Sequence, residues 1–373
     1  MNIWSIISLS IAIAASYYYY FHSTKLLNAV STNISKVSDS NNTKMSTTAG
    51  VSSVPKTIIK NAHPFPTYFF SHGGPTFMYE DDSFGDKGAW NKIKKIGTQI
   101  KQKWKPDFIL VVSAHWQSSR PNLIEINRVK NKTLENPLIY DFYGFPNHMY
   151  KEEFHSTNDE FIAEAVKQEL QANGFESKVV ERGIDHGVWV PFKVAFSDYN
   201  TQTRPQPEVK GLDVPCPVIQ ISLTSNDNDF DAHYKLGKVL NYFRENSIWD
   251  KRQNKYLSGM VICSGMSVHN LRDLGVAFRM PGGVMPYVKP FNQKLTQLLE
   301  QEQGDDLKKG LFNLQLDPLL RKAHPTLEHF LPVVVAGGIA DKSGDKIKEL
   351  YNAELASLGW GIYQVGDSPS VKI

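Results

Sequence analysis

Short apolar runs of strand length alternate with amphipathic helical patterns along most of this chain. Runs typical of buried strands fall at residues 68–70, 108–113, 123–126, 218–223, 257–264 and 361–365. Patterns with apolar residues three or four apart lie at residues 87–102, 159–172, 229–244 and 287–301. Strands that alternate with helices pack in layers. We therefore expect an α/β fold, a single layered domain with a central, mostly parallel or mixed sheet flanked by helices.

Two of the strand-like runs end in a histidine. The aromatic run that begins at Thr67 ends in His72, and two glycines and Pro75 then prevent the strand from continuing. The run at residues 108–113 is typical of a central strand buried on both faces, and it leads to His115. Open α/β sheets keep their sites at the carboxyl ends of strands. We expect His72 and His115 to point into one crevice there.

Two more histidines have similar surroundings. His186 lies between Asp185 and Gly187 in a segment without a clean helical or strand period, and this indicates a shaped loop. His269 follows the run at residues 257–264 and its small residues, so we expect it at another strand end. A single histidine in an apolar stretch is more often a core or surface residue than a ligand, but the setting shared by these four favours one metal site.

His329 belongs to a different kind of segment. Thr326 can cap a helix that begins near Leu327, and Pro325 ends the preceding element. The segment can therefore be interpreted simply as the start of a helix. His329 would then lie in the first turn, where the helix dipole disfavours positive charge and keeps the imidazole neutral. We expect His329 to face the substrate or to support the metal ligands.

Six motifs carry a resemblance to a known family. In chain order they are HGGP, SAHW, DFYGFP at residues 141–146, GIDHGVWVPF, SGMSVHNL and HPTLEHFLP. Together they resemble the LigB-type (class III) extradiol aromatic ring-opening dioxygenases, in particular the 4,5-DOPA dioxygenase-like branch. The resemblance covers about residues 65–367.

The resemblance implies a role for each histidine. His72, His115 and His269 match metal ligands, and His186 matches an acid/base catalyst or a fourth ligand. His329 matches a histidine beside the active site. The implied substrate is a small aromatic diol, DOPA or another catechol, which is cleaved with incorporation of O2.

Histidine suits this chemistry. Extradiol cleavage needs a redox-active ion with open positions for a catechol and for dioxygen. It also needs a base that takes a catechol proton and later returns one, and His186 is the expected base. We expect Fe(II), although an all-imidazole ligand set suits Zn(II) as well. A zinc-dependent hydrolase and a non-catalytic, membrane-tethered metal-binding protein of the same fold are the alternatives.

Asp185 and an aromatic loop are further candidates near the site. Asp185 could orient the imidazole of His186, or it could be only a turn or cap acid. The segment 140–146 is rich in aromatic residues, and Tyr143 and Phe145 within it could stack on a planar substrate ring or could only plug the core.

Charge and cysteine content exclude some partners. With 41 basic and 38 acidic residues the net charge is only +3, so we do not expect nucleic acid binding. Cys216 and Cys263 lie far apart in or beside apolar runs and are expected to be small core residues rather than a disulfide. The sequence does not specify an oligomeric state.

The amino-terminal part of the chain has a different character. Residues 3–21 are 19 residues without a charged side chain, about 28 Å as a helix, which is enough to cross the hydrocarbon core. We therefore expect a membrane anchor within residues 1–24. A cleaved signal peptide near residues 14–16 is the competing interpretation, although the segment lacks a basic n-region.

Residues 25–60 are rich in Ser, Thr and Asn and predict a flexible tether, which leaves residues 61–373 as the dioxygenase-like catalytic domain. Lys25, Lys36 and Lys44 follow the apolar segment, so the positive-inside tendency puts that domain on the cytoplasmic side. A soluble cytoplasmic form that starts at Met45 is the alternative.

Overall fold

The computed structural model describes residues 58–199, 202, 205 and 211–368. The predicted anchor and the predicted tether as far as residue 57 lie outside these residues. The last part of the tether segment contains β1 (Ile59–Lys60), which pairs with β7 (Asn246–Asp250). Among the described residues no helix is both long enough and apolar enough to cross a membrane.

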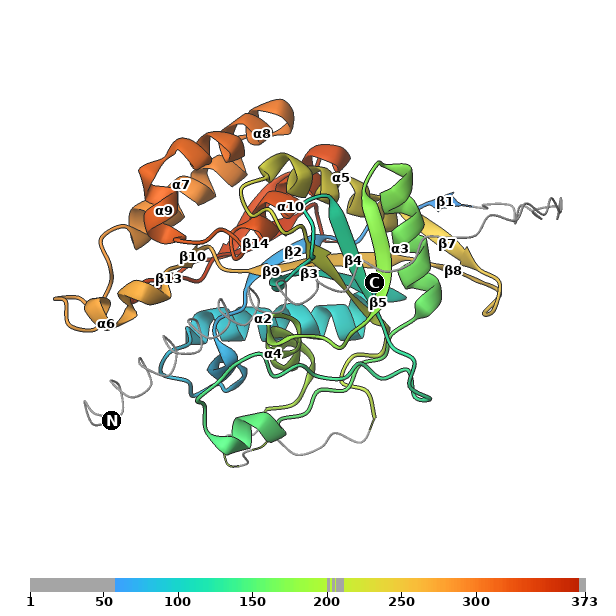
Figure 1. Ribbon diagram of the computed structural model, residues 1–373, viewed down its shortest axis with the longest axis horizontal. Coiled ribbons are helices and arrows are strands. Elements are labelled where there is room, and N and C mark those ends of the chain that lie inside the picture. Colours follow the sequence, from blue (N-terminus) through green and yellow to red (C-terminus); the bar gives the residue numbers. More distant parts are fainter. Residues whose placement is uncertain (1–57, 200–201, 203–204, 206–210, 369–373) are drawn as a thin grey trace, which may run out of the picture.

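In the described part of the chain, an eight-stranded sheet forms the middle of the molecule, in the order β11-β14-β2-β9-β3-β6-β4-β5 (Figure 1). The pairs β2–β9, β3–β9, β3–β6 and β4–β5 are parallel, whereas β11–β14, β14–β2 and β4–β6 are antiparallel. The predicted α/β fold with a mixed, mostly parallel sheet is therefore confirmed. The strands are β2 (Thr67–Ser71), β3 (Phe108–Gln117), β4 (Leu123–Arg128), β5 (Glu176–Glu181), β6 (Val218–Leu223), β9 (Gly259–Gly265), β11 (Ile347–Tyr351) and β14 (Ile362–Val365).

Alternate residues of the central strand β3 face two separate cores. Leu110 and Val112 pack into one core, and Ile109 and Val111 pack into the other. Side chains of a strand point to opposite faces in turn, so a strand covered on both faces is apolar throughout. This is why residues 108–113 form a continuous apolar run.

Helices cover both faces of the sheet (Figure 1). The first core lies under α3 (Glu160–Ala172), α5 (Phe230–Glu245), α7 (Val288–Gln301), α8 (Gly304–Asn313) and α10 (Leu331–Ser343). The second core lies under α2 (Lys87–Gln99) and α4 (His186–Phe196). Each core is named below by its central helix, the α10 side and the α4 side.

The amphipathic patterns predicted their helices well. Patterns 159–172, 229–244 and 287–301 correspond to α3, α5 and α7. Asp159 and Asp229 lie just before their helices and accept hydrogen bonds from backbone N–H groups of the first turn, as N-cap residues do. Pattern 87–102 forms α2 as far as Gln99 and then a π-helical turn.

The predicted loop around His186 is wrong. The segment forms the helix α4, which begins at His186 and is buried along its whole length. A helix that is buried all round has no polar face, so its sequence shows no amphipathic period. Pro191 inside the helix weakened the helical signal further.

The predicted helix start near Leu327 is four residues too early. Phe330 and Leu331 both donate backbone hydrogen bonds to the Leu327 carbonyl, which makes a turn, and α10 begins only at Leu331. His329 therefore lies in the turn that leads into α10 rather than in the helix.

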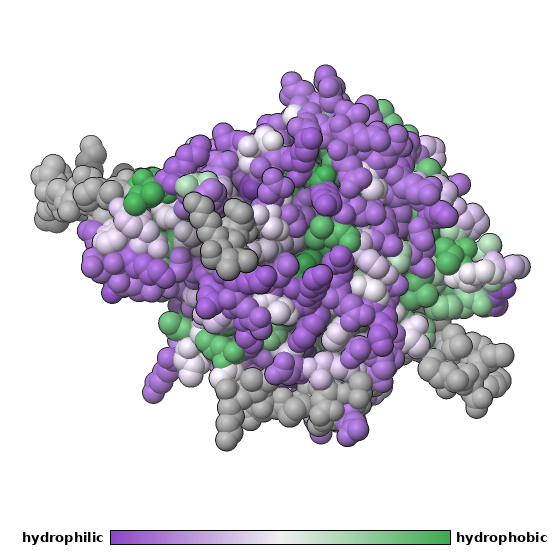
Figure 2. All heavy atoms as spheres, turned by 180° about the vertical axis from the view of Figure 1, so that it is seen from behind, coloured by the Kyte–Doolittle hydropathy of each residue, from purple (hydrophilic) through white to green (hydrophobic). Residues whose placement is uncertain are grey.

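The remaining α-helices and strands of the described residues are α6 (Leu274–Ala277), α9 (Pro318–Ala323), β8 (Lys255–Leu257), β10 (Val268–His269), β12 (Glu354–Leu355) and β13 (Leu358–Gly359). The predicted strand 257–264 thus divides between β8 and β9. On the face drawn in Figure 2, hydrophilic residues predominate and apolar residues gather in small separate groups.

Candidate metal centre and its pocket

His72 and His115 lie across the end of strand β9. His72 follows the last residue of β2, and its backbone N–H donates to the Gly265 carbonyl at the end of β9. His115 lies near the carboxyl end of β3, on the other side of β9. The expected crevice at the strand ends therefore contains both side chains, whose Nε2 atoms lie 3.1 Å apart.

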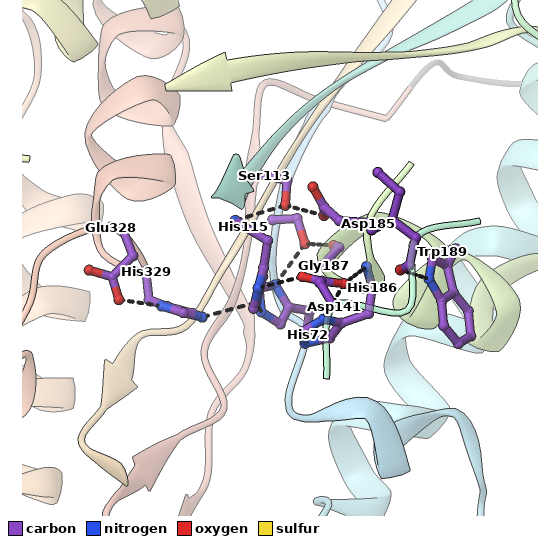
Figure 3. A network of polar contacts seen from close by, with 12 residues as sticks. His72, Ser113, His115, Asp141, Asp185, His186, Gly187, Trp189, Glu328 and His329 are labelled. Carbon is purple, nitrogen blue, oxygen red and sulfur yellow. Dashed lines mark hydrogen bonds and ion pairs between the residues drawn. The ribbon is translucent and has the colours of Figure 1, made fainter. Parts of the chain in front are cut away.

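Two further histidines come from outside the central sheet. His269 was expected at the end of the strand 257–264, but it is instead the last residue of the separate strand β10, which belongs to a small sheet with β13 and β12. His329 enters from the turn before α10, and its Nε2 lies 3.2 Å from the Nε2 of His115 (Figure 3). The rings of His269 and His329 stack at 3.6 Å between centroids.

The Nε2 atoms of His72, His115 and His329 thus converge on one point. Each of these rings is held from behind through its Nδ1 atom. The contacts are His72 with Ser264 Oγ at 2.9 Å, His115 with Asp141 Oδ2 at 3.2 Å and His329 with Glu328 Oε1 at 3.0 Å.

These outer contacts decide the tautomers. The two carboxylates can only accept hydrogen bonds, so Nδ1 of His115 and His329 carries the proton. Ser264 donates its own hydroxyl proton to the Gly187 carbonyl and is left to accept from Nδ1 of His72. With Nδ1 protonated, the neutral form of each ring turns an Nε2 lone pair toward the common point. Three lone pairs this close repel one another unless a cation lies between them.

The spacing fits such a cation. Two nitrogens bound about 2.1 Å from one ion at a right angle lie about 3 Å apart, close to the 3.1 and 3.2 Å found here. Three overlapping groups in the described residues bring possible ligand atoms within 4.8 Å of one another: His72 with His115 and His329, His115 with Asp141 and His186, and His269 with Glu328 and His329. The residues therefore suit a metal with imidazole ligands.

Burial keeps most of these rings neutral. Loss of hydration lowers the pKa of His72, His269 and His329 well below the usual value, and neighbouring imidazoles lower it further. Burial also acts to lower the pKa of His115, but the hydrogen bond and charge of Asp141 outweigh it and raise that pKa. A neutral ring is the form that can bind a metal.

His186 lies beside this group, at the start of α4. Its Nδ1 is 2.8 Å from Asp141 Oδ1, and its backbone N–H donates to the same oxygen. Its ring centroid is 3.9 Å from that of His115. Burial lowers the pKa of His186, although Asp141 partly offsets this. Asp141 therefore holds two of the site histidines at once (Figure 3).

Asp185 has a different place from the one suggested by its position next to His186. Its buried carboxylate accepts hydrogen bonds from Ser113 Oγ at 2.9 Å and from Arg182 at 3.0 Å, and it also accepts from Gln220. Adjacent residues at a helix start point apart, so Asp185 supports the strand that carries His115, while Asp141 orients His186.

A pocket opens over these histidines. Its lining includes His115, His186, His269 and His329, whereas His72 is not among the lining residues. Most of the remaining wall is apolar and is contributed by segments far apart in the chain: Pro75, Phe84, Ala114, Phe142, Phe145, Met266, Leu271, Leu274, Phe278, Leu355, Ala356 and Leu358. Of the predicted aromatic contacts, Phe145 lines the pocket, while the side chain of Tyr143 is 54% exposed and is not among the lining residues.

Sequence reasoning missed Asp141 and Glu328 as site residues. Both lie inside motifs quoted above, DFYGFP and HPTLEHFLP, whose aromatic residues and histidines are the more conspicuous features. Metal-binding histidines usually donate their other N–H to a carboxylate or a carbonyl. The acids inside these two motifs were therefore an available signal.

Comparisons with known proteins agree with the geometry. A family model described as "Catalytic LigB subunit of aromatic ring-opening dioxygenase" matches residues 66–363. The chain is 31% identical to a 4,5-DOPA dioxygenase extradiol-like protein of Schizosaccharomyces pombe, over 79% of this chain and 91% of that protein. It is 28% identical to a 4,5-DOPA dioxygenase extradiol of Beta vulgaris, over 80% of this chain and 94% of that protein. The fold is similar to that of uncharacterized protein JW3007 from Escherichia coli K12, with a TM-score of 0.57 at 20% identity, over 81% of this chain and 100% of that one.

Proposed function

This chain belongs to the LigB family of extradiol aromatic ring-opening dioxygenases, and from that premise we propose that it cleaves the ring of a catechol with dioxygen at a non-haem Fe(II) centre. In this reaction a carbon–carbon bond next to the diol breaks and both oxygen atoms of O2 enter the product. DOPA, the substrate in the names of several relatives, is one member of this substrate class.

One observation carries the proposal. Three imidazole Nε2 atoms meet, two of them from His115 and His329 in the lining of a largely apolar pocket, and His186 lines the pocket beside them. A planar aromatic diol has an apolar ring and two adjacent oxygens, so it matches both parts of this pocket. A ferrous ion held there would activate dioxygen and leave positions for the two catechol oxygens.

His72 and His115 belong to the ligand set on every argument. The family resemblance makes His269 the third ligand, whereas the Nε2 geometry favours His329. The rings of His269 and His329 are stacked on each other, so both lie at the same histidine cluster. Metal content of single variants distinguishes the two sets.

His186 is the proposed acid/base residue. Asp141 fixes its Nδ1 proton, which leaves Nε2 as the atom that accepts a proton from a catechol hydroxyl. Because burial lowers its pKa, the ring is neutral and able to accept at neutral pH. The protonated ring, stabilised by the Asp141 carboxylate, can later return the proton to an oxygen of the opening ring.

The first test is activity with a defined metal. The full chain is reconstituted without oxygen using Fe(II) or Zn(II), and oxygen uptake and visible absorbance are then followed with L-DOPA and simple catechols. We expect oxygen uptake with a yellow product in the iron sample alone. A folded, iron-loaded protein that cleaves no catechol would contradict the proposal and favour the zinc-hydrolase or the non-catalytic alternative.

Single variants then test the roles. His186→Ala should keep its metal and lose about 10²–10⁴-fold in kcat, the usual effect of removing a positioned base. His72→Ala should lose metal. Of the two variants His269→Ala and His329→Ala, only the one that removes the third ligand should lose metal. His155→Ala is the matched control, because His155 pairs with Glu135 and is not among the pocket-lining residues. An unchanged kcat in His186→Ala would remove that residue from the mechanism.

A further inference from the structure

The residues that line the pocket indicate which catechols it accepts, on the premise that the proposed function is correct. In the described part of the chain, neither lysine nor arginine is among the lining residues. Apart from the histidines, the ionisable groups of the lining are the carboxylates of Asp141 and Glu328. Asp141 contacts His115 and His186, and Glu328 accepts from Thr326 and contacts His329.

Two cations, one just before α4 and one inside it, are committed to other partners. Arg182 lies 4.3 Å above the ring of Trp116 and pairs with the buried carboxylate of Asp185 at 3.0 Å. Lys193, inside α4, pairs with the buried Glu152 at 3.2 Å. Each of these cations neutralises a buried acid, so turning toward a ligand would leave that acid unpaired.

Apart from Thr76, the wall away from the histidines and their carboxylates is apolar as far as the mouth. The ring of Phe142 lies 5.8 Å from that of His186, perpendicular to it, at the deep end. Leu274 and Leu358 are buried along the wall. Phe84 and Phe278 meet edge to face at 5.8 Å, and Phe278 is 36% exposed, so this pair lies where the pocket reaches solvent.

From this lining we infer that the preferred substrate is a catechol with an apolar, uncharged ring substituent, an alkyl or aryl chain, rather than a catecholic acid such as DOPA. With its diol over the histidines, a para substituent extends along the apolar wall. A carboxylate there loses its hydration and meets no lysine or arginine among the lining residues. A methylene buried there gains about fourfold in affinity.

Matched catechols test this directly. The iron-loaded full chain is assayed for kcat/KM with 4-methyl-, 4-ethyl-, 4-propyl- and 4-butylcatechol, with 3,4-dihydroxyphenylpropanoate, dopamine and L-DOPA. Binding of the same compounds is measured by calorimetry without oxygen, so that affinity is read independently of turnover. We expect kcat/KM and affinity to rise with alkyl length, and 4-butylcatechol to exceed 3,4-dihydroxyphenylpropanoate, which has a chain of similar length, by more than about tenfold.

A gain-of-charge variant gives the inference a second readout. Phe278→Lys places a cation at the mouth and should shift the preference toward 3,4-dihydroxyphenylpropanoate by about tenfold, whereas Phe278→Leu should keep the preference for alkyl chains. Val276→Lys is the matched charge control, because Val276 is exposed on α6 but is not among the lining residues. It should leave the ratio of the two substrates unchanged.

The outcomes separate the inference from the proposed function. Cleavage of L-DOPA or the propanoate in preference to 4-butylcatechol would overturn the inference and leave the dioxygenase proposal standing. Binding that favours the alkylcatechols without any cleavage would support the inference and contradict the function. If the metal-loaded protein binds no catechol at all, both fail.

Discussion

Asp141 connects the histidines proposed to bind metal with the one proposed to move protons. One carboxylate oxygen faces Nδ1 of His115, and the other faces Nδ1 and the backbone N–H of the His186 residue. The positive charge that develops on either ring holds the pKa of Asp141 well below its usual value, despite a burial that acts to raise it. Asp141 therefore stays ionised and orients both rings.

We expect Asp141→Asn to separate orientation from charge. The amide oxygen can still accept one hydrogen bond, but the negative charge that stabilises protonated His186 is gone, so kcat should fall about 10–100-fold while metal content falls less. Metal analysis together with kcat at several pH values measures this. Equal losses of metal and activity would mean that Asp141 acts only through His115, and an unchanged kcat would contradict both roles.

At the scale of elements, α4 must approach β3 closely for the site to form. A Cβ placed on Gly187 would lie 2.5 Å from Ser113 Oγ and 2.6 Å from the His115 ring. The backbone carbonyl of Gly187 also accepts the Ser264 hydroxyl that fixes the His72 tautomer. A glycine after the first helical residue thus serves packing and site geometry together.

Gly187→Ala should therefore damage both stability and site. We expect a loss of about 1–3 kcal/mol in the free energy of unfolding, typical of overpacking, together with weaker metal binding because His115 is displaced. Gly275→Ala in α6 is the control, since an added Cβ there meets nothing within 4 Å. Urea unfolding and metal titration of both variants measure this. Wild-type metal affinity in Gly187→Ala would contradict the close-approach argument.

Helix α5 contains a buried histidine with a clear effect of pH. His233 donates from Nδ1 to the Asp229 carbonyl and accepts the Thr224 backbone N–H at Nε2. Burial lowers its pKa to about 4. The folded state therefore takes up this proton only near pH 4, whereas the unfolded chain takes it up near pH 6.5, so stability present above pH 6.5 is lost as the pH falls toward 4.

The expected loss between pH 6.5 and 5 is about 1.6 kcal/mol from this residue, because the slope approaches 1.36 kcal/mol per pH unit only once the unfolded chain is fully protonated. In His233→Asn the amide can keep the hydrogen bond to the Asp229 carbonyl but does not titrate. The free energy of unfolding of this variant should therefore fall less than that of the wild-type protein over the same pH range, by that amount. Unfolding by urea across this range compares the two proteins. Parallel pH curves would show that His233 does not titrate on unfolding.

At the scale of the whole molecule, the site lies where the two cores meet. His186 comes from the α4 side, His329 from the turn before α10, and His72 and His115 from the sheet between them (Figure 3). A loss of packing on either side of the sheet should therefore displace the Nε2 atoms of His72, His115 and His329. The chain uses its whole layered architecture to hold four imidazoles within a few ångströms.

The predicted anchor is also a property of the whole molecule, and it stays a prediction outside the described residues. The full chain should sediment with membranes and resist extraction by alkaline carbonate, because residues 3–21 form a long uncharged segment. A chain that starts at Met45 should remain in the supernatant with the same activity. Complete extraction of the full chain by carbonate would contradict an anchor that spans the bilayer.

Local patterns were sufficient for much of the fold. Strands buried on both faces and amphipathic helices can be recognised from consecutive residues. The positions of His72 after β2 and of His115 near the end of β3 could be predicted in the same way. The helices α4 and α10 were harder to predict, because a helix buried on every side leaves no polar stripe to read.

The sequence by itself determined the layered α/β fold, the family and the histidines to consider, because these depend on residue order and on local period. Only the tertiary structure decided which imidazole nitrogens come together. His72 and His329 are 43 and 214 residues from His115 in the chain, yet their Nε2 atoms lie 3.1 and 3.2 Å from its Nε2. The bridging position of Asp141, 45 residues from His186, was decided in the same way. Contacts between such distant residues depend on how the layers pack, which no local period records.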